Sequence, residues 1–267
     1  MIKVNEQISI GDGRPLTLIA GPCVIESEEH VQFLAKEIGK IAGHFIFKAS
    51  FDKANRSSVS SYRGPGLKEG LRILKGVRDA GVPVLTDIHE ASQAGPVAEV
   101  ADILQIPAFL CRQTDLLVEA GRTGRIVNIK KGQFVAPHDI RHAAEKVAST
   151  GNGRILITER GSTFGYNNLV VDMRGIAIMR KTGWPVVFDA THSVQLPGAA
   201  GTASGGQPEF IEPLSRAAVA AGVDAVFVEV HEAPEKALSD GANALRLDHL
   251  GRLWRTLQRI REAAGSN

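Results

Sequence analysis

Short apolar runs alternate along the chain with longer segments in which apolar residues recur every three or four positions. The short runs are typical of buried strands, and the wider spacing, as in Val31, Leu34, Ile38 and Ile41, is typical of amphipathic helices. The predicted strands cover residues 16–20, 45–48, 82–86, 103–106, 126–130, 155–158, 186–189 and 225–229.

Continuous apolar strands joined by helices favour a parallel sheet that helices cover on its outer face. Eight such units in 267 residues predict an α/β protein with one domain over residues 1–267, a (β/α)8 (TIM) barrel. The alternative is a doubly wound open sheet. Against it, Gly21-Pro22-Cys23 follows the first strand, where that fold has a Gly-x-Gly-x-x-Gly turn.

Two segments fall outside this alternation. Residues 1–15 carry a Gly11-Asp12-Gly13 turn and predict a short N-terminal β-hairpin before the barrel. Residues 196–207 are rich in Gly, Ala and Ser, so we predict an irregular loop there, of a length often found in active-site lids.

The amino-acid composition and net charge limit the classes of binding partner and the cellular location that we expect. The net charge is only +2, from 31 basic and 29 acidic residues, which gives no support for binding to nucleic acid or to a membrane surface. The sequence has no signal-peptide pattern and no apolar run of about 18 residues, so we expect a cytoplasmic protein. Two cysteines, Cys23 and Cys111, do not suggest a disulfide framework.

Ionisable or strongly polar residues lie at the end of every predicted strand, where the catalytic groups of a barrel gather. One group is cationic and comprises Lys48, Lys53, Arg56, Arg112, Lys130 and Arg160. So many cations at one rim predict an anionic substrate with a phosphate and a carboxylate, or with two phosphates. The alternative is that one or two of them pair with Asp52, Asp87 or Glu159 and are purely structural.

A second group comprises Cys23, His192, Glu229 and Asp240. In a closed barrel the eighth strand lies beside the seventh and the first, so these side chains can converge. A thiolate, an imidazole and two carboxylates suit a divalent metal ion such as Zn²⁺, Fe²⁺ or Mn²⁺. The alternative is a buried cysteine, a strand-end histidine and two solvated carboxylates.

Several ordered motifs between about residues 16 and 250 resemble the 3-deoxy-D-manno-octulosonate 8-phosphate synthase (2-dehydro-3-deoxyphosphooctonate aldolase) family. They are IAGPCVIES (19–27), KASFDKANRSS (48–58), TDIHE (86–90), QIPAFLCRQ (105–113), NIKKGQ (128–133), TERG (158–161), FGYNNL (164–169), DATHSVQ (189–195) and LSD (238–240).

The resemblance implies a (β/α)8 barrel that assembles as a homotetramer. It implies a transferase that condenses phosphoenolpyruvate with D-arabinose 5-phosphate and water, releasing inorganic phosphate by breaking the C–O bond of phosphoenolpyruvate. That reaction belongs to the biosynthesis of the lipopolysaccharide inner core, in the cytoplasm.

The resemblance also implies roles for individual residues. The positions that bind phosphoenolpyruvate are Lys53, Arg112, Lys130 and Arg160, with Lys48 and Gln105 in the same pocket. Arabinose 5-phosphate is expected at Asn55, Arg56 and Ser57, the last two reaching it from a neighbouring subunit. Candidates to position the attacking water or the sugar are Asp87, His89 and Gln195, and the metal ligands match Cys23, His192, Glu229 and Asp240.

Cys23 matches the branch of this family that requires a divalent metal ion, because the metal-free branch has Asn there. The chain departs from that branch after Asp240, where Gly241 resembles the metal-free pattern. Two alternative functions differ from this synthase activity. One is the related synthase that uses erythrose 4-phosphate, whose Lys-Pro-Arg-Thr-Ser segment contrasts with residues 53–57. The other is a barrel that only binds a phosphosugar.

Overall fold

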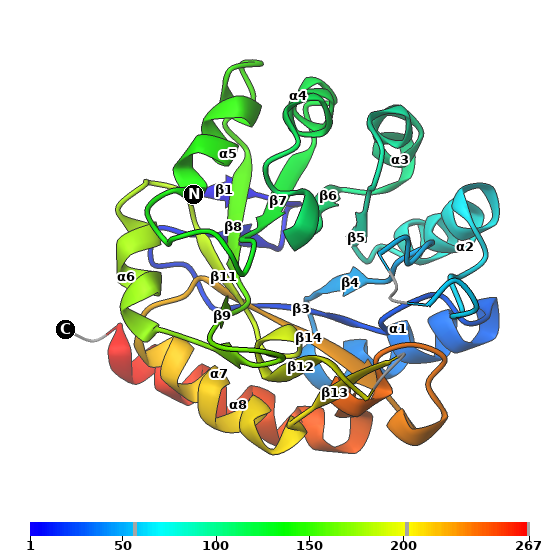
Figure 1. The fold of residues 1–267 in the computed structure, drawn as a ribbon. Helices are drawn as coiled ribbons and strands as arrows, with labels where there is room; N and C mark the ends of the chain where they lie inside the picture. The colour runs from blue at the N-terminus through cyan, green and yellow to red at the C-terminus, as the bar shows by residue number, and fades with distance from the viewer. Residues whose placement is uncertain (56–57, 201–202, 266–267) are drawn as a thin grey trace.

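The computed structural model describes residues 1–55, 58–200 and 203–265 (Figure 1). In this described part, eight parallel strands lie in the order β11-β8-β7-β6-β5-β4-β3-β14, and pairing of β11 with β14 closes them into a barrel. The strands are β3 (Thr17–Gly21), β4 (Ile46–Lys48), β5 (Val84–Asp87), β6 (Ile103–Ile106), β7 (Ile126–Lys130), β8 (Ile155–Glu159), β11 (Val186–Asp189) and β14 (Ala225–His231). The predicted (β/α)8 barrel is confirmed, and the predicted strands differ from the observed ones only at their ends.

Helices connect successive strands and surround the barrel (Figure 1). They are α1 (Glu28–Ala42), α2 (Leu67–Asp79), α3 (Ala94–Val100), α4 (Thr114–Arg122), α5 (Ile140–Ala148), α6 (Met173–Arg180), α7 (Ile211–Ala220) and α8 (Leu247–Ala264). The helical spacing read from the sequence is confirmed in α1, which buries Val31, Leu34 and Ile38. No helix in the described residues is long and apolar enough to cross a membrane.

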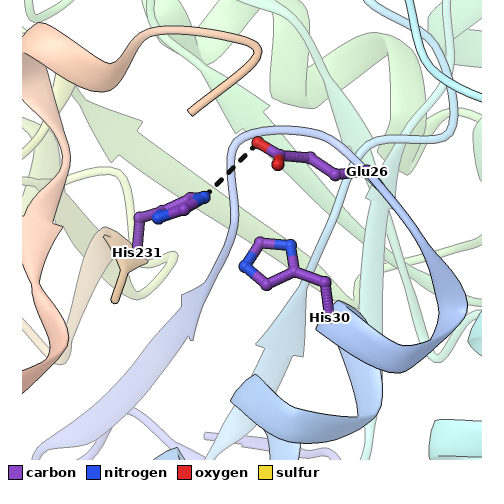
Figure 2. Close-up of side chains that lie close together, drawn as sticks. All are labelled: Glu26, His30 and His231. Atoms are coloured by element: carbon purple, nitrogen blue, oxygen red, sulfur yellow. Dashed lines mark ion pairs between the residues drawn. The ribbon is translucent and has the colours of Figure 1, made fainter. Parts of the chain in front are cut away.

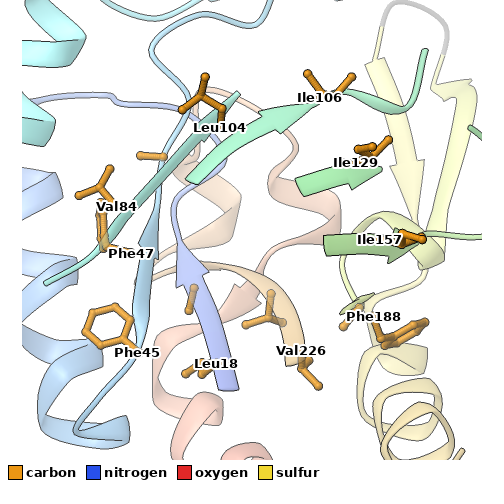
Figure 3. Close-up of a cluster of buried hydrophobic side chains, with 14 of the residues drawn as sticks. Leu18, Phe45, Phe47, Val84, Leu104, Ile106, Ile129, Ile157, Phe188 and Val226 are labelled. Atoms are coloured by element: carbon orange, nitrogen blue, oxygen red, sulfur yellow. The ribbon is translucent and has the colours of Figure 1, made fainter. Parts of the chain in front are cut away.

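Alternation along each strand creates two separate apolar layers. Side chains on the outer face, such as Phe47, Leu104 and Val226, pack against the helices (Figure 3). Inward-facing side chains form the second cluster, with Ile19 and Ile46 as members. Because side chains two positions apart point to the same side of a strand, the residues that follow the inner layer also face the barrel axis, at its carboxyl end.

The N-terminal hairpin is confirmed and closes the opposite end of the barrel. Strands β1 (Ile2–Lys3) and β2 (Ser9–Ile10) pair antiparallel, and Ile10 packs with the inner apolar cluster. The turn between these strands lies at Asn5, whose side-chain oxygen accepts the backbone N–H groups of residues 7 and 8. Gly11-Asp12-Gly13 follows β2, with positive φ at all three residues.

The prediction of an irregular loop at residues 196–207 is wrong. Strands β12 (Gln195–Ala200) and β13 (Ala203–Gly206) pair antiparallel as a hairpin after β11. A small residue is needed at Gly206, because a Cβ added there would lie 1.8 Å from the side-chain Oδ1 of Asn243 and 2.7 Å from the carbonyl oxygen of Ala242.

Candidate active site

A fully buried ion pair lies at the carboxyl end of β4 and β14. Nζ of Lys48 lies 2.6 Å from Oε1 of Glu229 and donates to the carbonyl oxygen of Cys23 at 2.7 Å. Burial by itself would raise the pKa of Glu229, but electrostatic interactions with Lys48, His192 and Lys53 lower it to about 2. Glu229 is therefore held as a carboxylate in the interior of the barrel.

Cys23, Glu229 and Asp240 each offer a ligand atom, and these atoms lie within 4.8 Å of one another. Sγ of Cys23 lies 3.3 Å from Oδ2 of Asp240, and Oε2 of Glu229 is buried without a hydrogen-bond partner in the described part of the chain. Burial and the nearby carboxylates raise the pKa of the Cys23 thiol. A thiol that ionises only beside added positive charge, next to an unsatisfied carboxylate oxygen, fits a divalent metal ion.

The fourth predicted ligand, His192, lies at the edge of this group. Its Nε2 is 3.8 Å from Oε1 of Glu229, and its Nδ1 is 2.8 Å from Oδ2 of Asp189. A carboxylate on one ring nitrogen fixes the tautomer and leaves the other nitrogen as a metal ligand. The arrangement therefore leaves Nε2 near Glu229, although His192 is not one of the three residues whose ligand atoms lie within 4.8 Å of one another.

Asp189 also holds a cation. Nζ of Lys130 lies 2.7 Å from Oδ2 of Asp189 and 4.2 Å from the centre of the Phe227 ring. Burial lowers the pKa of Lys130, and the Asp189 carboxylate partly offsets that effect. Burial also lowers the pKa of Arg160.

Lys53 and Asp87 extend the charged site towards β5. Burial would lower the pKa of Lys53, but the surrounding negative groups, including Glu229 and Asp87, raise it well above its ordinary value. Burial would raise the pKa of Asp87, yet His89, Lys53 and Lys48 outweigh it and lower that pKa. Asp87 also accepts a hydrogen bond from the Ser50 hydroxyl.

Arg160 and a chain of neutral polar groups complete the floor of the site. Nη2 of Arg160 donates to Oε1 of Gln195 at 3.1 Å, and its buried Nη1 has no hydrogen-bond partner within residues 1–55, 58–200 and 203–265. Nδ2 of Asn128 donates to Oε1 of Gln105 at 2.9 Å, and the Thr158 hydroxyl donates to Asn128 at 2.6 Å. The amide of Gln105 is thus held in one orientation, while Nη1 of Arg160 keeps a free donor for an anion.

Two predicted substrate residues lie outside this cluster. Arg112 is exposed and lines a separate cavity of about 460 Å³ with Phe134, His142 and Lys146. Asn55 is exposed on the loop after β4. Arg56 and Ser57 lie outside the described residues.

The departure at Gly241 has a structural cause. Asp240 adopts a left-handed conformation with φ of 49°, and the chain then passes close to η5 (Pro234–Lys236). A Cβ at position 241 would lie 2.1 Å from the carbonyl oxygen of Pro234. The glycine is thus explained by backbone packing.

Four contributors were not singled out in the sequence, namely Ser50, Asn128, Thr158 and Ser239. Asn128 and Thr158 could have been found, because each lies two positions after an inward apolar residue, Ile126 and Leu156. Ser239, whose Oγ lies 3.1 Å from Sγ of Cys23, carried no such signal.

The charges at this site balance before any ligand binds. In the described part of the chain, the cations are Lys48, Lys53, Lys130 and Arg160, and the carboxylates are Asp87, Asp189, Glu229 and Asp240. A phosphate and a carboxylate would add negative charge that these cations alone do not neutralise. A divalent cation beside Cys23 would offset part of that negative charge.

Comparison with known proteins places this barrel and its charged rim in a family. Residues 1–265 match the DAHP synthetase I family, and the chain belongs to that family. It is 61% identical over 258 residues to the 2-dehydro-3-deoxyphosphooctonate aldolase of Citrifermentans bemidjiense, covering 95% of this chain and 94% of that protein. The proteins of the same name from Geobacter sulfurreducens (61% over 258 residues, 95% of each chain) and Syntrophotalea carbinolica (60% over 264 residues, 97% and 95%) are similarly close.

The lowered pKa of Glu229 predicts a specific loss of stability in acid. A carboxylate whose pKa falls from 4.5 to about 2 on folding stabilises the protein above pH 4.5, and this contribution disappears as the pH falls towards 2. The contribution is roughly 3 kcal/mol. We expect urea unfolding to show wild type more stable than Glu229→Gln near pH 7, with the two converging below pH 4.5. A difference independent of pH would contradict the assignment.

Proposed function

We propose that this protein condenses phosphoenolpyruvate with D-arabinose 5-phosphate and water to form 3-deoxy-D-manno-octulosonate 8-phosphate and inorganic phosphate. The observation that carries the proposal is the group of buried cations at the barrel mouth, Lys48, Lys130 and Arg160, beside the half-buried Lys53. Sequence identity of about 60% with proteins named 2-dehydro-3-deoxyphosphooctonate aldolase supports this choice of reaction.

The cations bind phosphoenolpyruvate and fix the face of its enol that meets the sugar. Lys53, Lys130 and Arg160 neutralise its phosphate and carboxylate, and Lys48 and Gln105 line the same pocket. C3 of phosphoenolpyruvate bonds to the aldehyde carbon, whose oxygen gains a proton. The water oxygen bonds to C2 and loses its two protons, one of which ends on the former aldehyde oxygen and the other on the phosphate that leaves as the C2–O bond breaks.

The sugar phosphate is assigned to Asn55, Arg56 and Ser57 by resemblance. Asp87, held by Ser50 and 3.4 Å from Nε2 of His89, is placed to orient water or a sugar hydroxyl. The side-chain oxygen of Gln195 accepts a hydrogen bond from Arg160, and Gln195 is the first residue of the β12–β13 hairpin. A movement of that hairpin would therefore alter the contact with Arg160 at the anion site.

We further propose that the protein belongs to the metal-dependent branch, with Cys23, His192, Glu229 and Asp240 as ligands of a Zn²⁺, Fe²⁺ or Mn²⁺ ion. When bound, such an ion can polarise the aldehyde or lower the pKa of a water molecule from 15.7 to about 7. Asp189 orients His192 for this role, and Lys48 shares the charge of Glu229.

We place the reaction in the cytoplasm, as a step of lipopolysaccharide inner-core biosynthesis, and propose a homotetramer. Exposed aromatic side chains support assembly. Phe109, Phe134, Phe164 and Tyr166 are 57%, 57%, 72% and 100% exposed, on the loops that follow β6, β7 and β8. Apolar side chains gathered beside a site are typical of a protein interface. Arg56 and Ser57 would reach a neighbouring site across such an interface.

The substrate is tested by inorganic phosphate release from phosphoenolpyruvate, with arabinose 5-phosphate and erythrose 4-phosphate offered in parallel. We expect release only with the five-carbon sugar, and ¹⁸O in the bridging position to appear in the phosphate because the C–O bond breaks. Lys130→Met should lower kcat/KM about 100-fold or more, because a buried cation on the anion is lost. Release with erythrose 4-phosphate alone would indicate the alternative synthase, and no release with either would support a phosphosugar-binding barrel.

Metal dependence is tested by chelation. We expect wild-type activity to be lost after treatment with a chelator and restored by Zn²⁺, Fe²⁺ or Mn²⁺. Cys23→Ala should bind the ion at least about tenfold more weakly in chelator competition, because one ligand is lost. Cys111→Ala is the matched control, since Cys111 is also buried and free but lies elsewhere. A Cys23→Ala protein that stays fully active after chelation would refute the metal role.

Assembly is tested by light scattering. We expect a particle of four chains of 28.5 kDa for the wild type, and smaller particles for Phe164→Asp, which places a charge in the proposed interface. Phe33→Asp, on the exposed side of α1 at 44% exposure, is the control and should remain tetrameric. A wild-type mass equal to one chain at micromolar concentration would exclude the homotetramer.

A further inference from the structure

A second group of metal-ligand side chains lies beside the active site, on the outer side of the loops that build it. Glu26, His30 and His231 each offer one ligand atom within 4.8 Å of the others, and their side chains point towards one another (Figure 2). Glu26 lies on the loop after β3, His30 in the first turn of α1, and His231 at the end of β14. The proposed function uses none of them.

Two nitrogen atoms in this group are buried and have no hydrogen-bond partner among the residues that the structure describes. They are Nδ1 of His30 and Nε2 of His231. The His231 side chain is only 6% exposed, and its Nε2 lies 3.5 Å from Oε1 of Glu26. Buried polar atoms in native proteins are nearly always satisfied, so two unsatisfied imidazole nitrogens facing a carboxylate indicate a missing ligand.

Glu232 contacts the outer nitrogens of both rings. Its Oε2 lies 2.9 Å from Nε2 of His30 and 3.4 Å from Nδ1 of His231. A carboxylate that accepts the outer N–H of an imidazole directs the lone pair of the inner nitrogen at a metal ion. One carboxylate thus orients both histidines towards Glu26.

One hydrogen bond opposes this arrangement and must change. The backbone N–H of Ala233 donates to Nδ1 of His231 at 2.9 Å, which places the ring proton on Nε2 without a metal. Binding through Nε2 moves that proton to Nδ1, where Glu232 accepts it. The ring keeps one proton, so the exchange is balanced, and its cost lowers the affinity of the site.

The distance between the ligand atoms of His231 and Glu26 suits a small divalent ion. Zn²⁺ binds His nitrogen and carboxylate oxygen at about 2.1 Å, so tetrahedral ligand atoms are roughly 3.4 Å apart. The 3.5 Å separation between His231 and Glu26 matches that value. Two imidazoles and one carboxylate leave one position of a tetrahedral ion open.

We propose that Glu26, His30 and His231 form a second divalent metal site of the Zn²⁺ type. It would join the segments that carry the first site. Glu26 follows Cys23 by three residues and accepts the backbone N–H of Leu238 at 2.9 Å, two residues before Asp240, and His231 follows Glu229 by two. A cation there would hold the loop after β3 and the loop after β14 against the end of β14.

Titration of the metal-stripped full-length protein with Co²⁺ tests the proposal, because absorption separates the two sites. Only an ion on Cys23 gives a thiolate-to-cobalt band. We expect wild type to bind two equivalents, one with that band and one without. His30→Ala should lose the second, or bind it at least tenfold more weakly, and keep the thiolate band unchanged. Glu232→Gln should weaken it about 10- to 100-fold.

His249→Ala is the matched control, because its side chain is 58% exposed on α8, and it should bind both equivalents. His231→Gln provides a second variant if His30→Ala unfolds. If the Cys23 site binds no ion, wild type would bind one equivalent of Co²⁺ without the thiolate band. Loss of that bound equivalent in His30→Ala would still support the second site. Equal stoichiometry and affinity in wild type, His30→Ala and His231→Gln would overturn the proposal and leave the group a hydrogen-bonded cluster.

Discussion

Parallel pairing of β14 with β3 on one side and with β11 on the other closes the sheet, and the site depends on that closure. It brings Cys23 from the loop after β3 next to Glu229 on β14, although 206 residues separate them in the sequence. His192, after β11, reaches the same point from the other side. An open sheet would leave these strands at opposite edges with unpaired backbone groups, and the three side chains could not meet.

Closure also decides where charge can be buried. The inner face carries an apolar layer that the N-terminal hairpin covers at one end, and the polar layer two residues further along each strand faces the other end. Buried charges are stable only when they are paired. Lys48 with Glu229 and Lys130 with Asp189 are such pairs, and both take one partner from β11 or β14. The carboxylates of Glu229 and Asp189 therefore keep the cations of the candidate anion site in place.

The loops around this polar layer are tied to one another as well as to the strands. Gln195, the first residue of β12, contacts Arg160 after β8, and its register partner Gly206 in β13 packs against Asn243 near Asp240. On the outer side, Glu26 accepts a hydrogen bond from the loop that leads to Asp240. The segments that carry the candidate anion site and the candidate metal ligands thus contact one another.

The sequence by itself determined the barrel, because alternating apolar runs and helical spacing are local properties of the chain. It also placed charged groups at the strand ends, which gave Lys48, Lys130, Arg160 and Glu229 their positions. It did not predict the hairpin at residues 195–206, because small residues are compatible with both a loop and tightly packed strands. Only the tertiary structure decided which charges pair, that Arg112 is exposed and lines a cavity with His142 and Lys146, and that Glu26, His30 and His231 meet. Those outcomes depend on distances between loops far apart in the chain, which no local pattern encodes.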